Sequence, residues 1–153
     1  SSAASDVYKR QKLIKLGTQS IYEAPLLVTA VVAQPAPRAE ADLPDLKLLA
    51  ALPDGSALVT VPRYEAFMVY AQRLADQGVD FREIAGNGSF ILVSILAPQT
   101  WHPEATLTPL LVQPILTRPG VQRLLLAVPV QGLAQSLRQW KAAQFQVEHV
   151  FDY

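Results

Sequence analysis

The sequence contains no cysteine and no apolar run long enough to cross a membrane. Without cysteine there is no disulfide framework, no thiol nucleophile and no thiolate metal site. A membrane-spanning helix needs ~20 apolar residues in succession, and no segment approaches that length. Motifs of the P-loop, the dinucleotide-binding loop, the nucleophile elbow and the zinc proteases are missing as well. We therefore expect no transmembrane span, no bound metal and no cofactor.

Charged residues are scarce and balanced in sign. Lysine and arginine total 13, aspartate and glutamate total 13, and charged residues make up 17% of the chain. This balance gives neither the basic footprint of a nucleic-acid-binding protein nor a polybasic membrane surface. Hydrophobic residues make up 50% of the chain, which predicts a folded domain with a substantial core. A cytoplasmic and a periplasmic location both stay open.

The first eleven residues, Ser1–Gln11, resemble the translation of a transposase sequencing adapter. We therefore exclude residues 1–11 from the fold and expect the native protein to occupy 12–153. The native start is then unknown, and a signal peptide or further domain upstream of Lys12 stays open. Such an adapter also predicts a source in shotgun-sequenced DNA, most simply bacterial and environmental.

Two similar segments lie 67 positions apart (57 to 124). Ala57–Pro62 reads ALVTVP, Leu124–Pro129 reads LLLAVP, and each precedes a segment with helical periodicity. This similarity predicts an internal duplication, with one half at about 24–86 and the other at about 89–153. The offset falls to 66 at the last strand, which suggests a one-residue difference in the helix–strand loop. We expect a single domain with a pseudo-two-fold axis.

Both halves show the pattern strand, strand, strand, helix, strand. In the first half, a Pro-Asp-Gly-Ser turn predicts a hairpin between strands at 46–52 and 57–61. The second half repeats the hairpin with strands at 110–116 and 124–128. Pro114 indicates that the former strand is an edge strand or carries a bulge, because proline donates no ladder hydrogen bond.

Apolar residues recur with helical spacing over 63–77, which predicts an amphipathic helix. Pro62 suits the first turn of this helix, and Gly78 suits its C-terminal cap. The second helix is predicted from Pro129 to about Gln144.

The remaining strands complete the pattern. Strands are predicted at 79–85 and 147–153, and Asn87-Gly88 predicts a hairpin from the former into Phe90–Ala97. Leu26–Ala33 has two interpretations, a buried strand or the apolar region of a secretory signal. We favour the strand, because an acidic residue and a proline directly precede the run.

A strand–helix–strand link normally forms a right-handed parallel crossover, and the hairpins add antiparallel neighbours. The sequence therefore predicts an α+β fold with one mixed sheet and two helices on one face, a ferredoxin-like two-layer sandwich.

Candidate chemistry is sparse. His149 alternates with Glu148 along the last strand, so we expect the two side chains to point to opposite faces and not to bind one metal. Glu83 occupies the equivalent place in the first half. Glu83 and His149 could meet near the pseudo-axis as a general acid/base pair or half a metal site, with Asp80 and Asp152 as further acids. A structural role for both residues is the simpler interpretation.

Aromatic residues suggest a second candidate site. Tyr64 lies at the start of the first predicted helix, and Trp101 and His102 lie in the loop between two strands of the second half. A groove between the halves, lined by Tyr64, Trp101 and strand ends, could hold a small ligand or peptide. The alternative is that Trp101 packs on the sheet edge and His102 is a surface residue.

Three functional hypotheses remain. The first is a non-catalytic binding or interaction module for an unknown small ligand or protein partner. The second is an envelope-associated structural protein that self-associates or assembles through edge strands such as 110–116. The third, least favoured, is an enzyme that uses Glu83 and His149.

Overall fold

The computed structural model describes residues 14–16, 19–21, 27–38 and 40–152. The adapter-like segment 1–11, Lys12, Leu26 and Tyr153 lie outside the described residues. Two short strands, β1 (Ile14–Leu16) and β2 (Gln19–Ile21), pair with each other in a sheet of their own. The two larger sheets are built from the rest of the chain.

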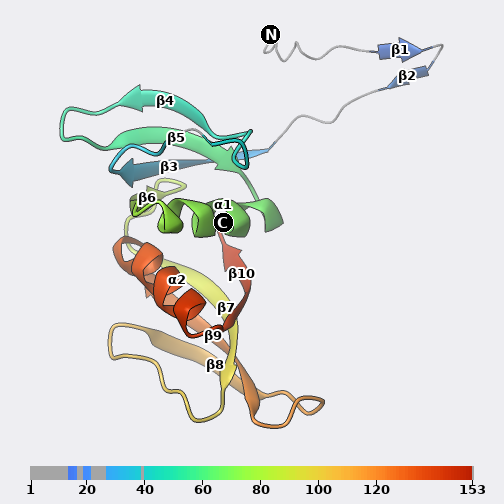
Figure 1. Cartoon of the computed structure of the whole chain (residues 1–153), viewed down its shortest axis with the longest axis vertical. Coiled ribbons are helices and arrows are strands. Elements are labelled where there is room, and N and C mark those ends of the chain that lie inside the picture. Colours follow the sequence, from blue (N-terminus) through green and yellow to red (C-terminus); the bar gives the residue numbers. More distant parts are fainter. Residues whose placement is uncertain (1–13, 17–18, 22–26, 39, 153) are drawn as a thin grey trace.

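Each half of the chain forms its own four-stranded sheet (Figure 1). The first sheet has the order β4-β5-β3-β6 and the second has the order β8-β9-β7-β10. In both sheets the first strand of the half lies between its third and fourth strands. The strands are β3 (Val28–Gln34), β4 (Lys47–Ala51), β5 (Ala57–Pro62), β6 (Asp80–Ile84), β7 (Phe90–Pro98), β8 (Thr108–Pro114), β9 (Val121–Pro129) and β10 (Gln146–Phe151).

The α+β class is confirmed, but the predicted single mixed sheet is wrong. All strand pairs in both sheets are antiparallel. The crossover from β5 to β6 does not create a parallel pair, because these two strands are not neighbours. β3 lies between them and pairs with both. The ferredoxin-like topology is not confirmed. The strand interpretation of Leu26–Ala33 is confirmed for its described part, since β3 is an inner strand of the first sheet.

The turn around Asn87 also differs from its prediction. The chain does reverse there, with the N–H of Asn87 donating to the carbonyl of Ile84 and the N–H of Ile84 donating to the carbonyl of Asn87. However, β6 and β7 belong to different sheets, so the predicted hairpin between them is wrong. A turn sequence specifies a tight reversal, but it does not specify that the flanking strands pair with each other.

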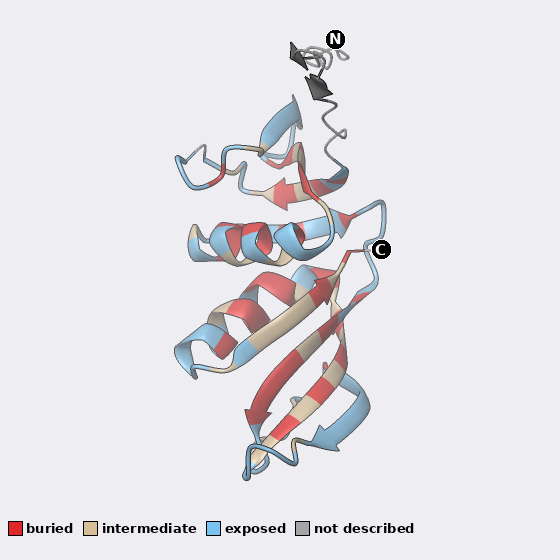
Figure 2. Ribbon diagram, turned by 90° about the vertical axis from the view of Figure 1, so that its right-hand side faces the viewer, coloured by how far each residue is buried: buried red, intermediate tan, exposed pale blue. Residues whose placement is uncertain are grey.

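The two helices lie between the sheets (Figures 1 and 2). α1 (Glu65–Asp76) contacts β5 of the first sheet, and α2 (Leu133–Ala142) contacts β10 of the second sheet. The two helices also contact each other. The layers therefore run sheet, helix, helix, sheet, and the prediction of both helices on one face of one sheet is wrong. Each sheet keeps an outer face that no described helix covers.

The two prolines that were expected to start the helices end strands instead. Pro62 is the last residue of β5 and pairs with Val28, and Pro129 is the last residue of β9 and pairs with Phe90. α1 begins after Tyr64, and a short 3-10 turn, η1 (Val130–Gly132), precedes α2. Proline has no N–H to donate, so it serves a strand end as readily as a first helical turn.

The one-residue difference between the halves lies before the last turns of the helices. Gly78 and Gln144 each lie just after a helix, and each has a positive φ, 86° and 63° respectively. These two residues are 66 positions apart (78 to 144). The next residues repeat as well, because Val79 donates to the carbonyl of Leu74 and Phe145 donates to that of Trp140. The offset of 66 thus holds through both helix ends, and the predicted place of the change, the helix–strand loop, is wrong.

One continuous core joins the halves. It contains inward residues of β3, β5, β6, β7, β9 and β10 together with one face of each helix, whereas the edge strands β4 and β8 contribute none. Val59 and Leu126 occupy equivalent places in β5 and β9, with 1% and 0% of their surface exposed. Neither half therefore buries its apolar face alone.

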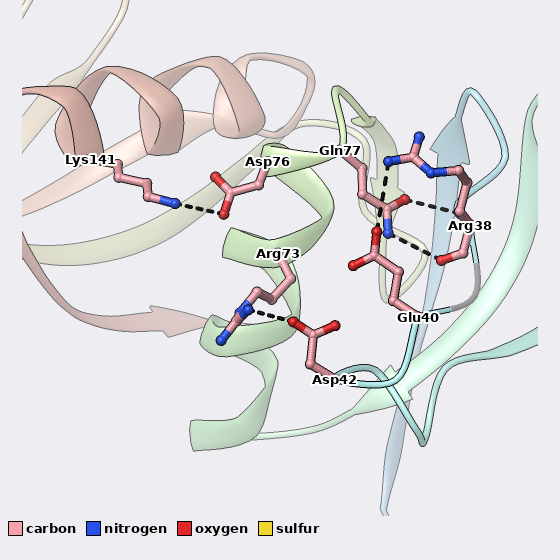
Figure 3. Close-up of polar contacts among 7 residues, drawn as sticks. All are labelled: Arg38, Glu40, Asp42, Arg73, Asp76, Gln77 and Lys141. Atoms are coloured by element: carbon pink, nitrogen blue, oxygen red, sulfur yellow. Dashed lines mark hydrogen bonds and ion pairs between the residues drawn. The ribbon is translucent and has the colours of Figure 1, made fainter.

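Polar contacts between the helices add to this core. The ammonium of Lys141 lies 2.8 Å from the carboxylate of Asp76 (Figure 3). Arg138 donates to the carbonyl of Ala75 at 3.0 Å and to the carboxylate of Asp80 at 3.1 Å. These exposed contacts fix the relative rotation of the helices more than they stabilise the fold.

The loop between β3 and β4 is attached to α1 (Figure 3). The amide of Gln77 accepts a hydrogen bond from the N–H of Arg38 and donates one to its carbonyl, and Arg73 pairs with Asp42. Leu43 from this loop is buried in the core. The corresponding loop of the second half ends in the same kind of turn, with a buried Leu107.

No helix among the described residues is both long enough and apolar enough to span a membrane.

Candidate functional site

Glu83 and His149 occupy equivalent positions, as the sequence predicts. Glu83 of β6 pairs with Val32, and His149 of β10 pairs with Ser94. Val32 and Ser94 in turn face Leu58 of β5 and its equivalent in β9. Both side chains therefore project from the outer faces of their sheets.

A β-bulge lies beside each of these residues. Arg82 in β6 and Glu148 in β10 are extra residues with no partner across the pair. The same repetition holds in the edge strands, where Leu49 of β4 and Leu110 of β8 are bulged. In a bulge, two residues of one strand lie opposite a single residue of the partner strand, which changes the direction of a side chain.

The bulge in β10 overturns the expected alternation. Glu148 bonds to Ser94, the residue with which His149 pairs, so Glu148 and His149 both lie on the outer face of the sheet. The prediction that these neighbours point to opposite faces is wrong, because the extra residue shifts the period by one.

The structure does not bring Glu83 and His149 into contact. They belong to different sheets, and no hydrogen bond or ion pair between described residues joins them. Glu83 is exposed, and the ring of His149 lies edge-on to Phe151 with centroids 4.4 Å apart. The described residues also contain no group of three or more His, Asp or Glu that could hold a metal.

Glu148 is the centre of a small polar network. Its carboxylate accepts hydrogen bonds from Nε and Nη2 of Arg123, at 2.7 and 2.9 Å, and from the hydroxyl of Ser94 at 2.9 Å. The hydrogen bonds from Arg123 lower the pKa of Glu148 below its ordinary 4.5, burial opposes the shift, and Ser94 adds to it. This network links β10, β7 and β9 across the outer face.

The first half contains a network of the opposite polarity at its bulge. Arg82 donates to the side chain of Gln34 at 2.6 Å and lies 3.3 Å from the carboxylate of Asp54. Hydrogen bonds from the hydroxyl and N–H of Ser56 lower the pKa of Asp54, and Arg82 adds to that shift. The bulged residue is therefore a cation in one half and an anion in the other.

Trp101 and Tyr64 have different surroundings. Trp101 packs edge-on to Phe145, 5.2 Å between centroids, and borders a cavity of about 130 Å³ at the C-terminal end of α2. Tyr64 caps the other helix, with a φ of 62°, and the guanidinium of Arg63 lies 4.8 Å from its ring centre. His102 is exposed in its loop. The predicted groove that joins Tyr64 with Trp101 stays a prediction.

A larger cavity, about 250 Å³, lies where the β6–β7 turn meets the end of β10. Its walls include Phe90 and Leu92 of β7, Phe151 of β10, and Asn87 of the turn. Asp152 also borders it and is 2% exposed. The sequence suggests Asp152 as a possible acid, but no motif predicts this cavity, because its walls lie far apart along the chain.

The edge strand β8 is an apolar element that is exposed along its whole length, as the shorter edge strand β4 is. All seven of its residues are exposed (Figure 2), with Leu110 at 56%, Leu111 at 48% and Val112 at 54%. It pairs with β9 on one side, and no described strand pairs with its other side. The prediction that this strand is an edge strand is confirmed.

Comparison of the chain with protein-family models, with curated proteins and with solved structures finds no match.

Proposed function

We propose that this protein is a non-catalytic interaction module whose contact element is the free edge of β8. The exposure of β8 carries this proposal, because an unpaired strand edge offers backbone donors and acceptors to another strand. Proteins protect such edges with charged side chains, prolines or bulges. β8 has no charged residue, and its two prolines and the bulge at Leu110 limit the length of edge that can pair.

The prolines of β8 define the length of the contact. Pro109 and Pro114 have no N–H, so the segment Leu110–Gln113 is the part that can pair fully with another strand. The equivalent edge, β4, also exposes Leu48 and Leu49 but begins with Lys47 and is shorter. We therefore expect β8 to be the stronger of the two contact edges.

The partner that fits this edge is a second copy of the chain. An antiparallel pair of Leu110–Gln113 segments sets Leu111 opposite Val112 of the other copy, sets Leu110 opposite Gln113, and places the prolines outside. The segment carries no charge, and the whole chain has a net charge of 0, so the copies do not repel each other. A contact this short predicts weak, concentration-dependent association.

Sedimentation velocity of the full chain over a hundredfold concentration range tests this proposal. The wild-type chain is expected to shift from monomer toward dimer as its concentration rises. Leu111→Lys places a charge in the contact and should keep the chain monomeric throughout. Leu116→Lys makes the same change at a residue that is 92% exposed and outside β8, so it should behave as wild type. A wild-type chain that stays monomeric, or two variants that behave alike, would contradict the proposal.

The enzyme hypothesis has less support. Glu83 and His149, its proposed acid/base pair, lie in different sheets, and His149 contacts Phe151. The envelope-associated hypothesis uses the same edge strands as our proposal, and the same sedimentation experiment bears on it.

A further inference from the structure

The cavity bordered by Asp152 contains an incompletely satisfied carboxylate. Oδ2 of Asp152 accepts a hydrogen bond from the hydroxyl of Thr29 at 2.5 Å. Oδ1 is buried, with no hydrogen-bond partner. A buried carboxylate oxygen without a partner is costly, so native proteins nearly always satisfy it with a donor or a cation.

Among the residues that the structure describes, no lysine or arginine borders this cavity. Its other walls are mainly apolar, and two of them are aromatic, Phe90 and Phe151. The ring of Phe151 is supported from the side by His149, whose ring centre lies 4.4 Å away. A carboxylate next to aromatic faces is the combination that recognises organic cations, because the ring faces attract positive charge.

The first half lacks this combination at the equivalent place. Ala85 donates to the carbonyl of Ala30 at 2.8 Å, which is the counterpart of the pairing of Phe151 with Leu92. Gly86 follows Ala85 as Asp152 follows Phe151. No ring and no carboxylate therefore occupies these positions in the first half.

Phe90 shows the same difference. It pairs with the proline that ends β9, and its counterpart, Val28, pairs with the proline that ends β5. Both rings and the acid are thus present in the second half alone, although the two backbones match. This difference on a shared backbone favours a specific role for the three side chains over a requirement of the fold.

We infer that this cavity is a binding site for a small organic ammonium ion. The ammonium lies against the rings of Phe90 and Phe151, where the negative charge of Asp152 in the cavity wall attracts it. The volume of about 250 Å³ lies just below the range of about 300–1,000 Å³ of pockets for drug-sized ligands, so it suits a short alkylamine. This site is separate from the β8 edge, and the inference does not rest on self-association.

NMR titration of the ¹⁵N-labelled full chain with n-butylammonium chloride tests the site. The expected result is saturable shifts of the amides of Phe90–Leu92 and of Phe151 and Asp152. 1-Butanol has the same alkyl chain without the charge and should bind at least about tenfold more weakly, because it lacks the positive charge that the carboxylate and the rings attract. Nα-acetyl-lysine methylamide presents the same ammonium on a peptide. Weaker binding of this compound than of butylammonium identifies a free amine as the ligand, and equal binding identifies a lysine side chain.

Three variants separate the site from general charge effects. Asp152→Asn should weaken butylammonium binding at least about tenfold. Glu104→Gln makes the same change in an exposed loop and should leave binding unchanged. Phe90→Val introduces the residue that the first half has at the equivalent position. Phe90 is 52% exposed, so the fold should tolerate this change, and butylammonium binding should weaken severalfold. This variant tests the site even if Asp152→Asn fails to fold. Equal binding of butanol and butylammonium, unchanged binding by Phe90→Val, or shifts elsewhere in the chain would overturn the inference.

Discussion

The two halves of this protein share a backbone and differ on their outer surfaces. Strand order, the bulges in the second and fourth strands, and the positive φ after the helix recur in both halves. The inner faces are apolar in both, because both contribute to one core. On the outer side, the bulged residue of the last strand is a cation, Arg82, in the first half and an anion, Glu148, in the second. The comparison indicates that the core maintains the shared backbone, whereas the outer faces are where the halves have acquired different properties.

The largest expected effect tests whether the halves share one core. Leu126→Ala should lower the free energy of unfolding by about 2–5 kcal/mol, because it removes a fully buried side chain and leaves a cavity. Val59→Ala at the equivalent place removes fewer carbon atoms and should cost less. Urea denaturation should show one transition that both substitutions move. Two transitions, each moved by one substitution, would show that the halves fold separately.

The next effect concerns the contact between β3 and the end of β10. Thr29→Val keeps the shape of the side chain but removes the donor to the buried Asp152, and should cost about 1–3 kcal/mol. Thr60→Val makes the same change on the outer face of β5 and should have a smaller effect. Thermal unfolding of both variants compares them directly. A similar loss in each would mean that the contact with Asp152 contributes little.

A reciprocal exchange at the helix ends gives a smaller effect. Gln144 adopts a positive φ that glycine adopts in the first half, at Gly78. Gly78→Gln should therefore destabilise the chain by about 1 kcal/mol, and Gln144→Gly should stabilise it by up to about that amount. Opposite shifts of the midpoint in urea would confirm that the two positions are equivalent. Shifts of the same sign would contradict it.

The smallest effect is the pH dependence of the Glu148 network. The pKa of Glu148 is lower in the folded chain than its ordinary 4.5, so its contribution to stability is present above that pH. This contribution is lost as the pH falls below about 4.5 and through the folded pKa. The difference in stability between wild type and Glu148→Gln should therefore shrink on acidification. Asp54→Asn, in the exposed network of the first half, should show the same direction with a smaller amplitude. A difference that grows with acid would contradict the assignment.

Local elements of this fold could be predicted from the sequence, but their partners could not. The turn at Pro53–Ser56 and the alternation around it identified the β4–β5 hairpin, and helical spacing identified α1 and α2. Whether β6 pairs with β7 or with β3 depends on long-range packing, which a turn such as Asn87-Gly88 does not specify. For this reason the sequence pattern favoured one sheet where the strands β3 to β10 form two.

The candidate sites show a similar division. The exposed edge at β8 was predictable, because Pro114 is incompatible with an inner strand. The bulge at Glu148 was not, because an extra residue leaves no mark in composition. The cavity at Asp152 depends on residues from the β6–β7 turn and the end of the chain. A signal for it was present nonetheless, since aligning the halves sets Phe151 and Asp152 against Ala85 and Gly86.

Amide hydrogen exchange of the full chain at low and high concentration most directly tests the claim that β8 is the contact edge. We predict that the amides of Leu110–Gln113 exchange more slowly at high concentration, and that those of Lys47–Ala51 in the equivalent strand β4 change little. This result would show that the shared backbone presents a functional edge in the second half. Exchange that is independent of concentration in both strands, or slowing in β4 instead of β8, would contradict the account.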